Sequence, residues 1–373
     1  MLKYTDSFRA ASRPVLLLLG GLLAAVSGTA YAADIPEVTG ALVSRGAGER
    51  AYQHQLPPQA VDTRSLPLTR LTADDSDNAT LPLYRLGPDT YFLYGNIATL
   101  DTDNRGFNGN AGFVVTGEGV VVIDALGTPK LGRRLIATIR SVTDEPIRYL
   151  ILTHNHPDHA YGANAFRALE GISIVAHPGM LEYSGSQTMQ RSVDYRRDLL
   201  PQDMAGFGFV EPDIYTPEQR FQALQLELGG KRFDVYNAGH HHSHGDLVVH
   251  QPDTGILWVS DLAFNQRVTF MGDGHSGEAI EGQDWLLAQF GDARLMVPGH
   301  GSAQRPPFPM VSQTRAYIQQ LRERMKQKVV DGVPLLDALN DAAMPAWRDL
   351  PLYDENQRAN ASFIYREMEL EFF

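Results

Sequence analysis

The chain has 373 residues, carries a formal net charge of −12 and contains no cysteine. The absence of cysteine excludes disulfide bonds, thiolate nucleophiles and cysteine-ligated zinc. The acidic balance argues against a nucleic-acid partner, because phosphate contacts need clustered Lys and Arg.

The first 32 residues predict a secretory signal peptide. A basic start precedes an apolar run of 12 residues from Val15 to Val26, and Ala30-Tyr31-Ala32 is a small-residue cleavage site. The apolar run is too short to span a bilayer comfortably. We therefore expect a periplasmic or secreted protein without stable membrane insertion after cleavage. The alternative is a buried or interfacial N-terminal helix.

Three further segments are expected after the signal peptide. Residues 33–80 are rich in Pro, Gln, Ser, Thr and Asp, and predict an extended N-terminal lead-in. Residues 81–302 contain short apolar runs bounded by glycines, which are typical of strands in a folded core. Residues 303–373 show helical spacing of apolar side chains and predict a helical C-terminal extension.

Within the core, short strands are predicted over 90–94 and 112–115, followed by a helix over 131–142. Residues 148–152 predict a buried strand, whereas residues 183–219 lack a clear periodicity. We expect this last section to be an insertion near the mouth of a site.

The most informative segment is Thr153-His154-Asn155-His156-Pro157-Asp158-His159. Neutral imidazoles offer lone pairs to metal ions, and the carboxylate compensates their charge. The segment follows the predicted strand 148–152 and precedes a helix-like stretch, so its side chains can converge outside the carboxyl end of the strand. The alternative is a histidine-rich surface turn.

Other candidate ligands lie beside later predicted strands. A run of histidines, His240-His241-His242-Ser243-His244, precedes the strand 247–249. Asp261 ends another predicted strand, and His300 follows the strand 295–298.

The pattern H-x-H-x-D-H after an apolar strand resembles the signature of the metallo-β-lactamase superfamily, and the later pieces agree with it in order. The resemblance spans about Leu83 to Gly301. It implies an α/β fold, a four-layer αβ/βα metallo-β-lactamase sandwich, with the helical extension added to it. The run from Thr153 to Phe166 and the helical tail also resemble periplasmic zinc hydrolases associated with quinoprotein dehydrogenases and sulfur oxidation.

The same resemblance implies two metal ions, with zinc as the default and iron or manganese as alternatives. The implied ligands of the first ion are His154, His156 and His242, those of the second are Asp158, His159 and His300, and Asp261 bridges the two. His242 is chosen by its register to Gly245-Asp246, with its neighbouring histidines as alternatives. Asp124, at the end of the strand 120–123, would orient the ligand loop.

The implied function is an exported dinuclear zinc hydrolase in which a metal-bridging hydroxide attacks an ester, thioester, lactone, lactam or phosphodiester. Asp158 would be the catalytic carboxylate that orients the hydroxide. His275 is a candidate contact for the small-molecule substrate, or an exposed loop histidine. Two alternatives stay open: a periplasmic metal-binding accessory protein for a quinoprotein or sulfur-oxidation system, and an iron-dependent redox member of the fold. The helical tail could serve as a homodimer face.

Overall fold

The computed structural model describes residues 43–44 and 76–372. The predicted signal peptide and most of the predicted lead-in lie outside the described residues. Within the described ranges, no helix is both long enough and apolar enough to cross a membrane.

The first sheet has seven strands in the order β2-β3-β4-β5-β6-β7-β8. The strands from β2 to β5 pair antiparallel, and those from β5 to β8 pair parallel, so β5 belongs to both parts. The parallel strands are short and rich in Val and Ile, as expected for strands that are covered on both faces. Their bounds are Tyr84–Gly87, Thr90–Leu93, Ala111–Val115, Val120–Ile123, Ile147–Ile151, Ser173–Ala176 and Ile214–Tyr215.

The second sheet also has seven strands, in the order β1-β14-β13-β12-β11-β10-β9. Strand β1 pairs parallel with β14, so a piece of the predicted lead-in adds an edge strand to the core. The bounds, in chain order from β1 and then from β9, are Val43–Ser44, Ala223–Leu228, Lys231–Gly239, Asp246–Gln251, Ile256–Ser260, Leu295–Pro298 and Ala303–Gln304.

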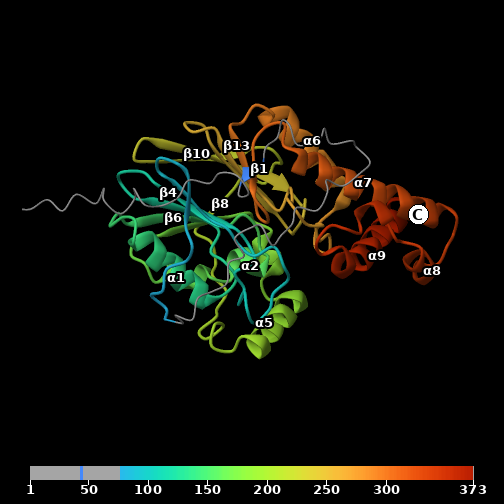
Figure 1. Cartoon of the computed structure of the whole chain (residues 1–373), viewed down its shortest axis with the longest axis horizontal. Helices are drawn as coiled ribbons and strands as arrows, with labels where there is room; N and C mark the ends of the chain where they lie inside the picture. The colour runs from blue at the N-terminus through green and yellow to red at the C-terminus, as the bar shows by residue number, and fades with distance from the viewer. Residues whose placement is uncertain (1–42, 45–75, 373) are drawn as a thin grey trace, which may run out of the picture.

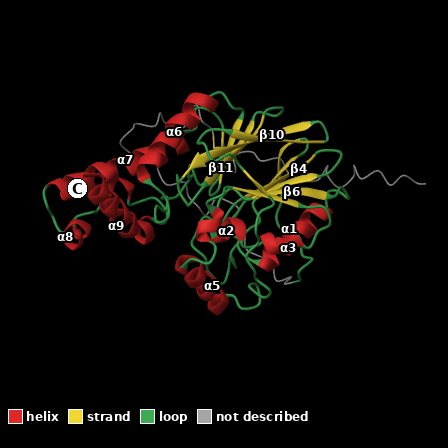
Figure 2. Ribbon diagram, turned by 180° about the vertical axis from the view of Figure 1, so that it is seen from behind, coloured by secondary structure: helices red, strands yellow, loops and turns green. Residues whose placement is uncertain are grey.

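The two sheets face each other across an apolar core that includes Phe92, Ile151, Phe233 and Trp258. Helices cover both outer faces (Figure 2). On the first sheet these are α1 (Pro129–Arg140), α2 (Pro157–Ala160) and α3 (Ala163–Arg167), and on the second they are α6 (Ser276–Phe290) and the start of α7 (Pro309–Val330). This is the four-layer αβ/βα arrangement, which confirms the fold predicted from the sequence.

Helix α1 shows how local sequence sets an element boundary. Thr128 has an extended backbone, and its side chain accepts a hydrogen bond from Leu131 N at 3.2 Å. Pro129 occupies the first turn, where its missing N–H costs nothing. The helix therefore begins two residues earlier than the predicted start at residue 131.

The C-terminal helices form a separate lobe beside the sandwich (Figure 1). Helices α7, α8 (Leu335–Asn340) and α9 (Tyr353–Phe372) share an apolar cluster with Val268 and Met271 of the core. Residues 303–304 form strand β14, so the helical part of the extension begins at Pro309, later than the predicted boundary at 303.

The section 183–219, which showed no periodicity in the sequence, contains a regular helix. Helix α5 spans Gln187–Leu199 and begins at Ser186, whose hydroxyl accepts a hydrogen bond from Met189 N at 3.0 Å. Only Met189, Val193 and Arg196 are buried along it. One of these three is charged, so too few apolar positions repeat for a sequence pattern to reveal the helix. The short helix α4 (Met180–Tyr183) precedes it.

Candidate metal centre

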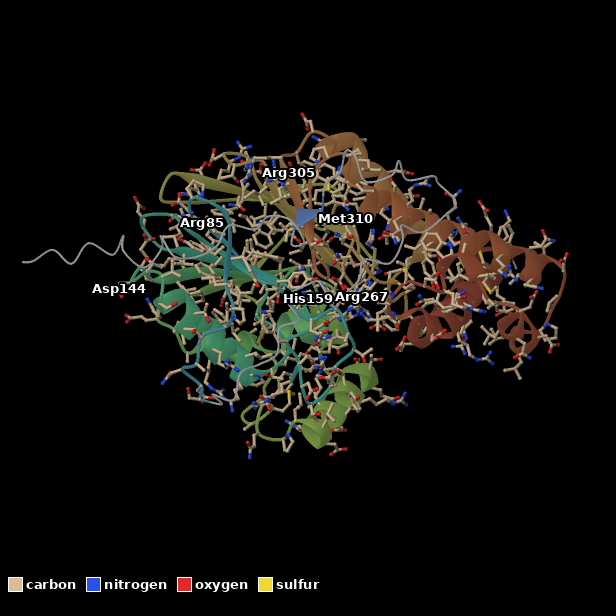
Figure 3. All side chains as sticks on the ribbon, viewed as in Figure 1. Arg85, Asp144, His159, Arg267, Arg305 and Met310 are labelled. Atoms are coloured by element: carbon tan, nitrogen blue, oxygen red, sulfur yellow. The ribbon has the colours of Figure 1, made fainter. Side chains whose placement is uncertain are left out.

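The seven predicted ligands lie together in two adjacent groups. His154, His156, His242 and Asp261 form the first, and Asp158, His159 and His300 form the second, with ligand atoms in each group within 4.8 Å of one another. Asp261 joins the groups, because its carboxylate oxygens lie 3.5 Å from His159 Nε2 and 3.3 Å from His300 Nε2. Figure 3 shows His159 at the edge of the sandwich, close to Arg267.

The metal loop follows strand β6 and is fixed by Asp124 at the end of the neighbouring strand β5. Asp124 accepts hydrogen bonds from Thr153 N at 2.8 Å and from Thr153 Oγ1 at 2.9 Å. It also lies 2.8 Å from His159 Nδ1. A proton on Nδ1 donated to this carboxylate leaves the Nε2 lone pair of His159 free for a metal ion. Asp124 thus contacts the metal loop where the resemblance implied, and it does so from a left-handed backbone with φ of 62°.

His300 follows strand β13 and is oriented in the same way by a different acceptor. Its Nδ1 lies 2.7 Å from the carbonyl oxygen of Asn108, so the Nδ1 proton is donated there and Nε2 turns toward Asp261. The preceding Gly299 has a steric reason to be glycine. A Cβ at this position would lie 1.9 Å from Asp261 Oδ1, so any side chain would displace the carboxylate between the two groups.

The histidine run between β10 and β11 presents His242 to the centre. The Asp246 carboxylate accepts hydrogen bonds from His242 N at 2.7 Å and Ser243 N at 2.9 Å, which curls the loop around it. His242 Nε2 then lies 3.1 Å from Asp261 Oδ2. His241 is buried on the other side, where its ring would block a Cβ at Gly282, and His240 is exposed.

The charges of the centre favour a cation. Burial alone would lower the pKa of His159, but the carboxylates of Asp261 and Asp124 raise it to about 10. A histidine that holds its proton this firmly lies in a field that also attracts metal cations. Burial and the charge of His159 hold the pKa of His154 well below its usual range, so this imidazole stays neutral and keeps its lone pair.

Two buried polar atoms identify where a cation would fit. His154 Nε2 and Asp261 Oδ1 have no hydrogen-bond partner, although both are shielded from solvent. Unpaired buried polar atoms are costly in a folded protein. A metal ion between these groups would satisfy both atoms, and the imidazole and carboxylate donors suit zinc, iron or manganese.

Three further residues at the centre were not predicted as site residues. Asp273 Oδ2 lies 3.1 Å from His156 Nε2. The buried Arg196 and the half-buried Arg267 interact electrostatically with Asp158. The two arginines carry no local motif that could reveal them.

His275 is placed differently from the other candidates. Its side chain is 45% exposed and lies 3.1 Å from Glu367 Oε1. It also caps helix α6 by accepting a hydrogen bond from Glu278 N at 3.3 Å. These contacts hold the imidazole toward helix α9, and its role as a substrate contact stays a prediction.

Curated proteins of two kinds match parts of the chain. It is 34% identical over 55 residues to a linear primary-alkylsulfatase from Pseudomonas sp., which is 15% of this chain and 10% of that protein. It is 24% identical over 191 residues to metallo-beta-lactamase type 2 from Bacillus cereus, which is 50% of this chain and 64% of the relative. The chain thus covers less than two thirds of either relative.

Solved structures share the fold at low sequence identity. A metallo-beta-lactamase from Pontibacter korlensis aligns with a TM-score of 0.51 and 18% identity, over 64% of this chain and 98% of that chain. A stereoselective inverting sec-alkylsulfatase from Pseudomonas sp. aligns with a TM-score of 0.61 and 16% identity, over 82% of this chain and 57% of that chain. At these identities the similarity establishes the fold alone.

The family is shown by a model match to the sequence itself. The model described as the metallo-beta-lactamase superfamily matches residues 104–300, which is more than half of the chain. The matched range begins just before strand β4 and ends at His300, and it contains all seven predicted ligands. This chain therefore belongs to the metallo-beta-lactamase superfamily.

Proposed function

We propose that this chain is an exported hydrolase that uses two metal ions, with zinc as the preferred metal. The observation that carries the proposal is the placement of seven ligand side chains in two adjacent groups joined by Asp261. Membership of the metallo-beta-lactamase superfamily supports zinc and hydrolysis. When bound, two such ions would supply a hydroxide nucleophile near neutral pH and a Lewis acid for the scissile bond.

Asp158 is the proposed catalytic carboxylate. Asn108 Nδ2 donates a hydrogen bond to its Oδ2 at 3.0 Å, and His300 Nε2 lies 3.4 Å from the same oxygen. Burial raises the pKa of Asp158, but the nearby charges of His159 and His300 outweigh it and lower the pKa below its usual range. An ionised carboxylate fixed at this point can orient an attacking hydroxide and accept a proton from it.

The proposed substrates are small molecules with an ester, thioester, lactone, lactam or phosphodiester bond. The names of the relatives add sulfate esters to this range, because two of them are alkylsulfatases. The chain covers only part of each alkylsulfatase, so their substrates are candidates to be assayed.

Metal content and turnover test the proposal together. Protein purified without added metal should contain close to two equivalents, mostly zinc, and should hydrolyse at least one of these bond types. Asp158→Asn should lose most turnover even where both metal ions are retained, while the matched variant Asp349→Asn, at an exposed carboxylate, should keep it. Undiminished turnover in Asp158→Asn would remove Asp158 from the mechanism.

The same experiment separates the alternatives. A stable content of one iron per chain would favour the redox member of the fold. A metal-loaded protein that hydrolyses none of the bond types would make the periplasmic accessory protein the better proposal.

Export is proposed on the sequence of residues 1–32. Cleavage after Ala32 gives a defined mature mass, so intact-mass measurement of the periplasmic protein tests it. A full-length mass in the membrane fraction would show an uncleaved anchor.

A further inference from the structure

Arg196 is a buried cation without a local counter-ion. It lies on helix α5, and only 6% of the residue is exposed. Its Nε and Nη1 have no hydrogen-bond partner, and no carboxylate in the described part of the chain lies within ion-pair distance of it. Arginine is rarely buried unless its guanidinium is paired, because unpaired buried charge is costly. The position therefore calls for a negatively charged group that is not part of the protein.

The nearest acidic influence on Arg196 is already engaged. Asp158 interacts with Arg196 electrostatically, but its Oδ2 faces Asn108 and His300 in the metal centre. A carboxylate that ligates a metal ion has little charge left to offer a guanidinium. Metal binding by Asp158 would therefore leave the positive charge of Arg196 less compensated.

Arg196 packs against Tyr161, a residue that also lines a small, mostly apolar pocket next to the metal loop. Its guanidinium carbon lies 5.6 Å from the centre of the Tyr161 ring, which orients the planar group. Tyr161, Tyr183 and Asn155 line one pocket with apolar neighbours such as Phe207. Both side-chain polar atoms of Asn155 are buried and unpaired, so a second hydrogen-bonding group is available where the pocket meets the metal loop.

The charge balance of the whole centre points the same way. Asp124, Asp158, Asp261 and Asp273 are opposed by two arginines, Arg196, which is buried, and Arg267, which is half-buried. Without metal the acidic groups prevail. Two divalent cations would reverse the sign and leave surplus positive charge, which a neutral substrate cannot compensate.

We propose that Arg196 binds an oxyanion of the substrate, so that the preferred substrates are esters that carry a carboxylate, sulfate or phosphate group. The substrate preference in this inference rests on the proposed hydrolase function, whereas the binding of an anion by Arg196 does not. The guanidinium presents a planar set of donors that matches any of these oxyanions. Arg196 then positions the substrate, and the metal centre acts on the bond beside it.

The test compares Arg196→Met, which removes the charge, with Arg196→Lys, which keeps it. Arg197→Met is the matched control, because Arg197 is the next residue on the same helix and is exposed. Calorimetric titrations of metal-loaded protein with inorganic sulfate, inorganic phosphate and succinate distinguish the three oxyanions. We expect Arg196→Met to weaken binding of the preferred anion about tenfold to a hundredfold. Arg196→Lys should lose less, and Arg197→Met should match the wild type.

Turnover adds a second readout. The substrates are p-nitrophenyl butyrate and mono-p-nitrophenyl succinate, which present the same type of ester without and with a carboxylate, together with p-nitrophenyl sulfate and phosphate. Arg196→Met should raise KM for the anionic substrates and leave the neutral ester unchanged. If no ester is hydrolysed, the titrations still decide the role of Arg196, and only the hydrolase proposal fails.

Equal anion affinity in the wild type and Arg196→Met, at equal metal content, would overturn the proposal, because the anion would then bind to the metal ions alone. If Arg196→Met does not fold, Arg196→Gln takes its place as the variant without the charge, and equal anion affinity in the wild type and Arg196→Gln would again decide against the proposal.

Discussion

The metal loop and the loop after strand β12 lie on opposite sides of one site, but they are held in different ways. The metal loop, residues 153–159, is fixed by Asp124 on the neighbouring strand. The loop of residues 262–275 is fixed by the C-terminal lobe. Asn360 of helix α9 accepts a hydrogen bond from Met271 N at 2.9 Å and donates one to the Thr269 carbonyl at 2.8 Å.

This difference separates metal binding from the shape of the site. Side chains of the core sheets position the ligands, whereas the C-terminal lobe positions the wall that carries Asp273. Phe270 of that wall has its ring centre 6.2 Å from that of His156 and 6.0 Å from that of Phe363 on helix α9. The comparison predicts that variants on the two sides should have different signatures.

The largest effect is expected for Asp261→Ala. This change removes the carboxylate that lies against ligands of both groups, so metal content should fall from two equivalents toward none. Loss of activity should exceed the roughly 100-fold that is typical for residues that only support a ligand. Elemental analysis and turnover measure both. Retention of two metal ions would show that Asp261 does not join the groups.

The next effect distinguishes neighbours in the histidine run. His242→Ala should lose about one metal equivalent, because its Nε2 is the one that faces Asp261 at 3.1 Å. His241→Ala should keep both ions and lose only packing against helix α6. Metal analysis of the two variants side by side tests this register. The reverse result would move the ligand by one residue.

A smaller effect is expected for Asp124→Asn. The amide keeps the shape but weakens the acceptor for Thr153 and His159, so metal affinity should fall about 10-fold to 100-fold. Competition with a chelator measures it. An unchanged affinity would mean that the backbone of the metal loop is rigid without Asp124.

The smallest effect on metal content is expected for the loop of residues 262–275, which the C-terminal lobe holds. Asn360→Ala leaves the buried Met271 N without its acceptor, which should lower the free energy of unfolding by about 1–3 kcal/mol. Metal content should not change, but KM should rise because the loop around Asp273 is released. The exposed Asn340→Ala is the matched control. Loss of metal in Asn360→Ala would contradict the separation of the two regions.

The sequence predicted the fold from local patterns, and the family resemblance carried by those patterns named seven candidate ligands. Short apolar strands end in ligand residues, and the seven predicted ligands do lie together in the structure. The arginines were not predictable, because Arg196 and Arg267 reach the centre only through packing between distant segments. Helix α5 was not predicted for a related reason, because its buried face includes Arg196 in place of an apolar residue.

The apolar cluster shared by Val268, Met271 and the C-terminal helices has a consequence for heating. Parts of a protein that share buried surface tend to open as one cooperative unit. Fraying of the lobe should therefore disturb one side of the substrate space while the sheets still hold their ions. If the proposed hydrolase function holds, thermal inactivation should then begin below the temperature at which the bound metal is released, and the protein should pass through a folded, metal-loaded but inactive form.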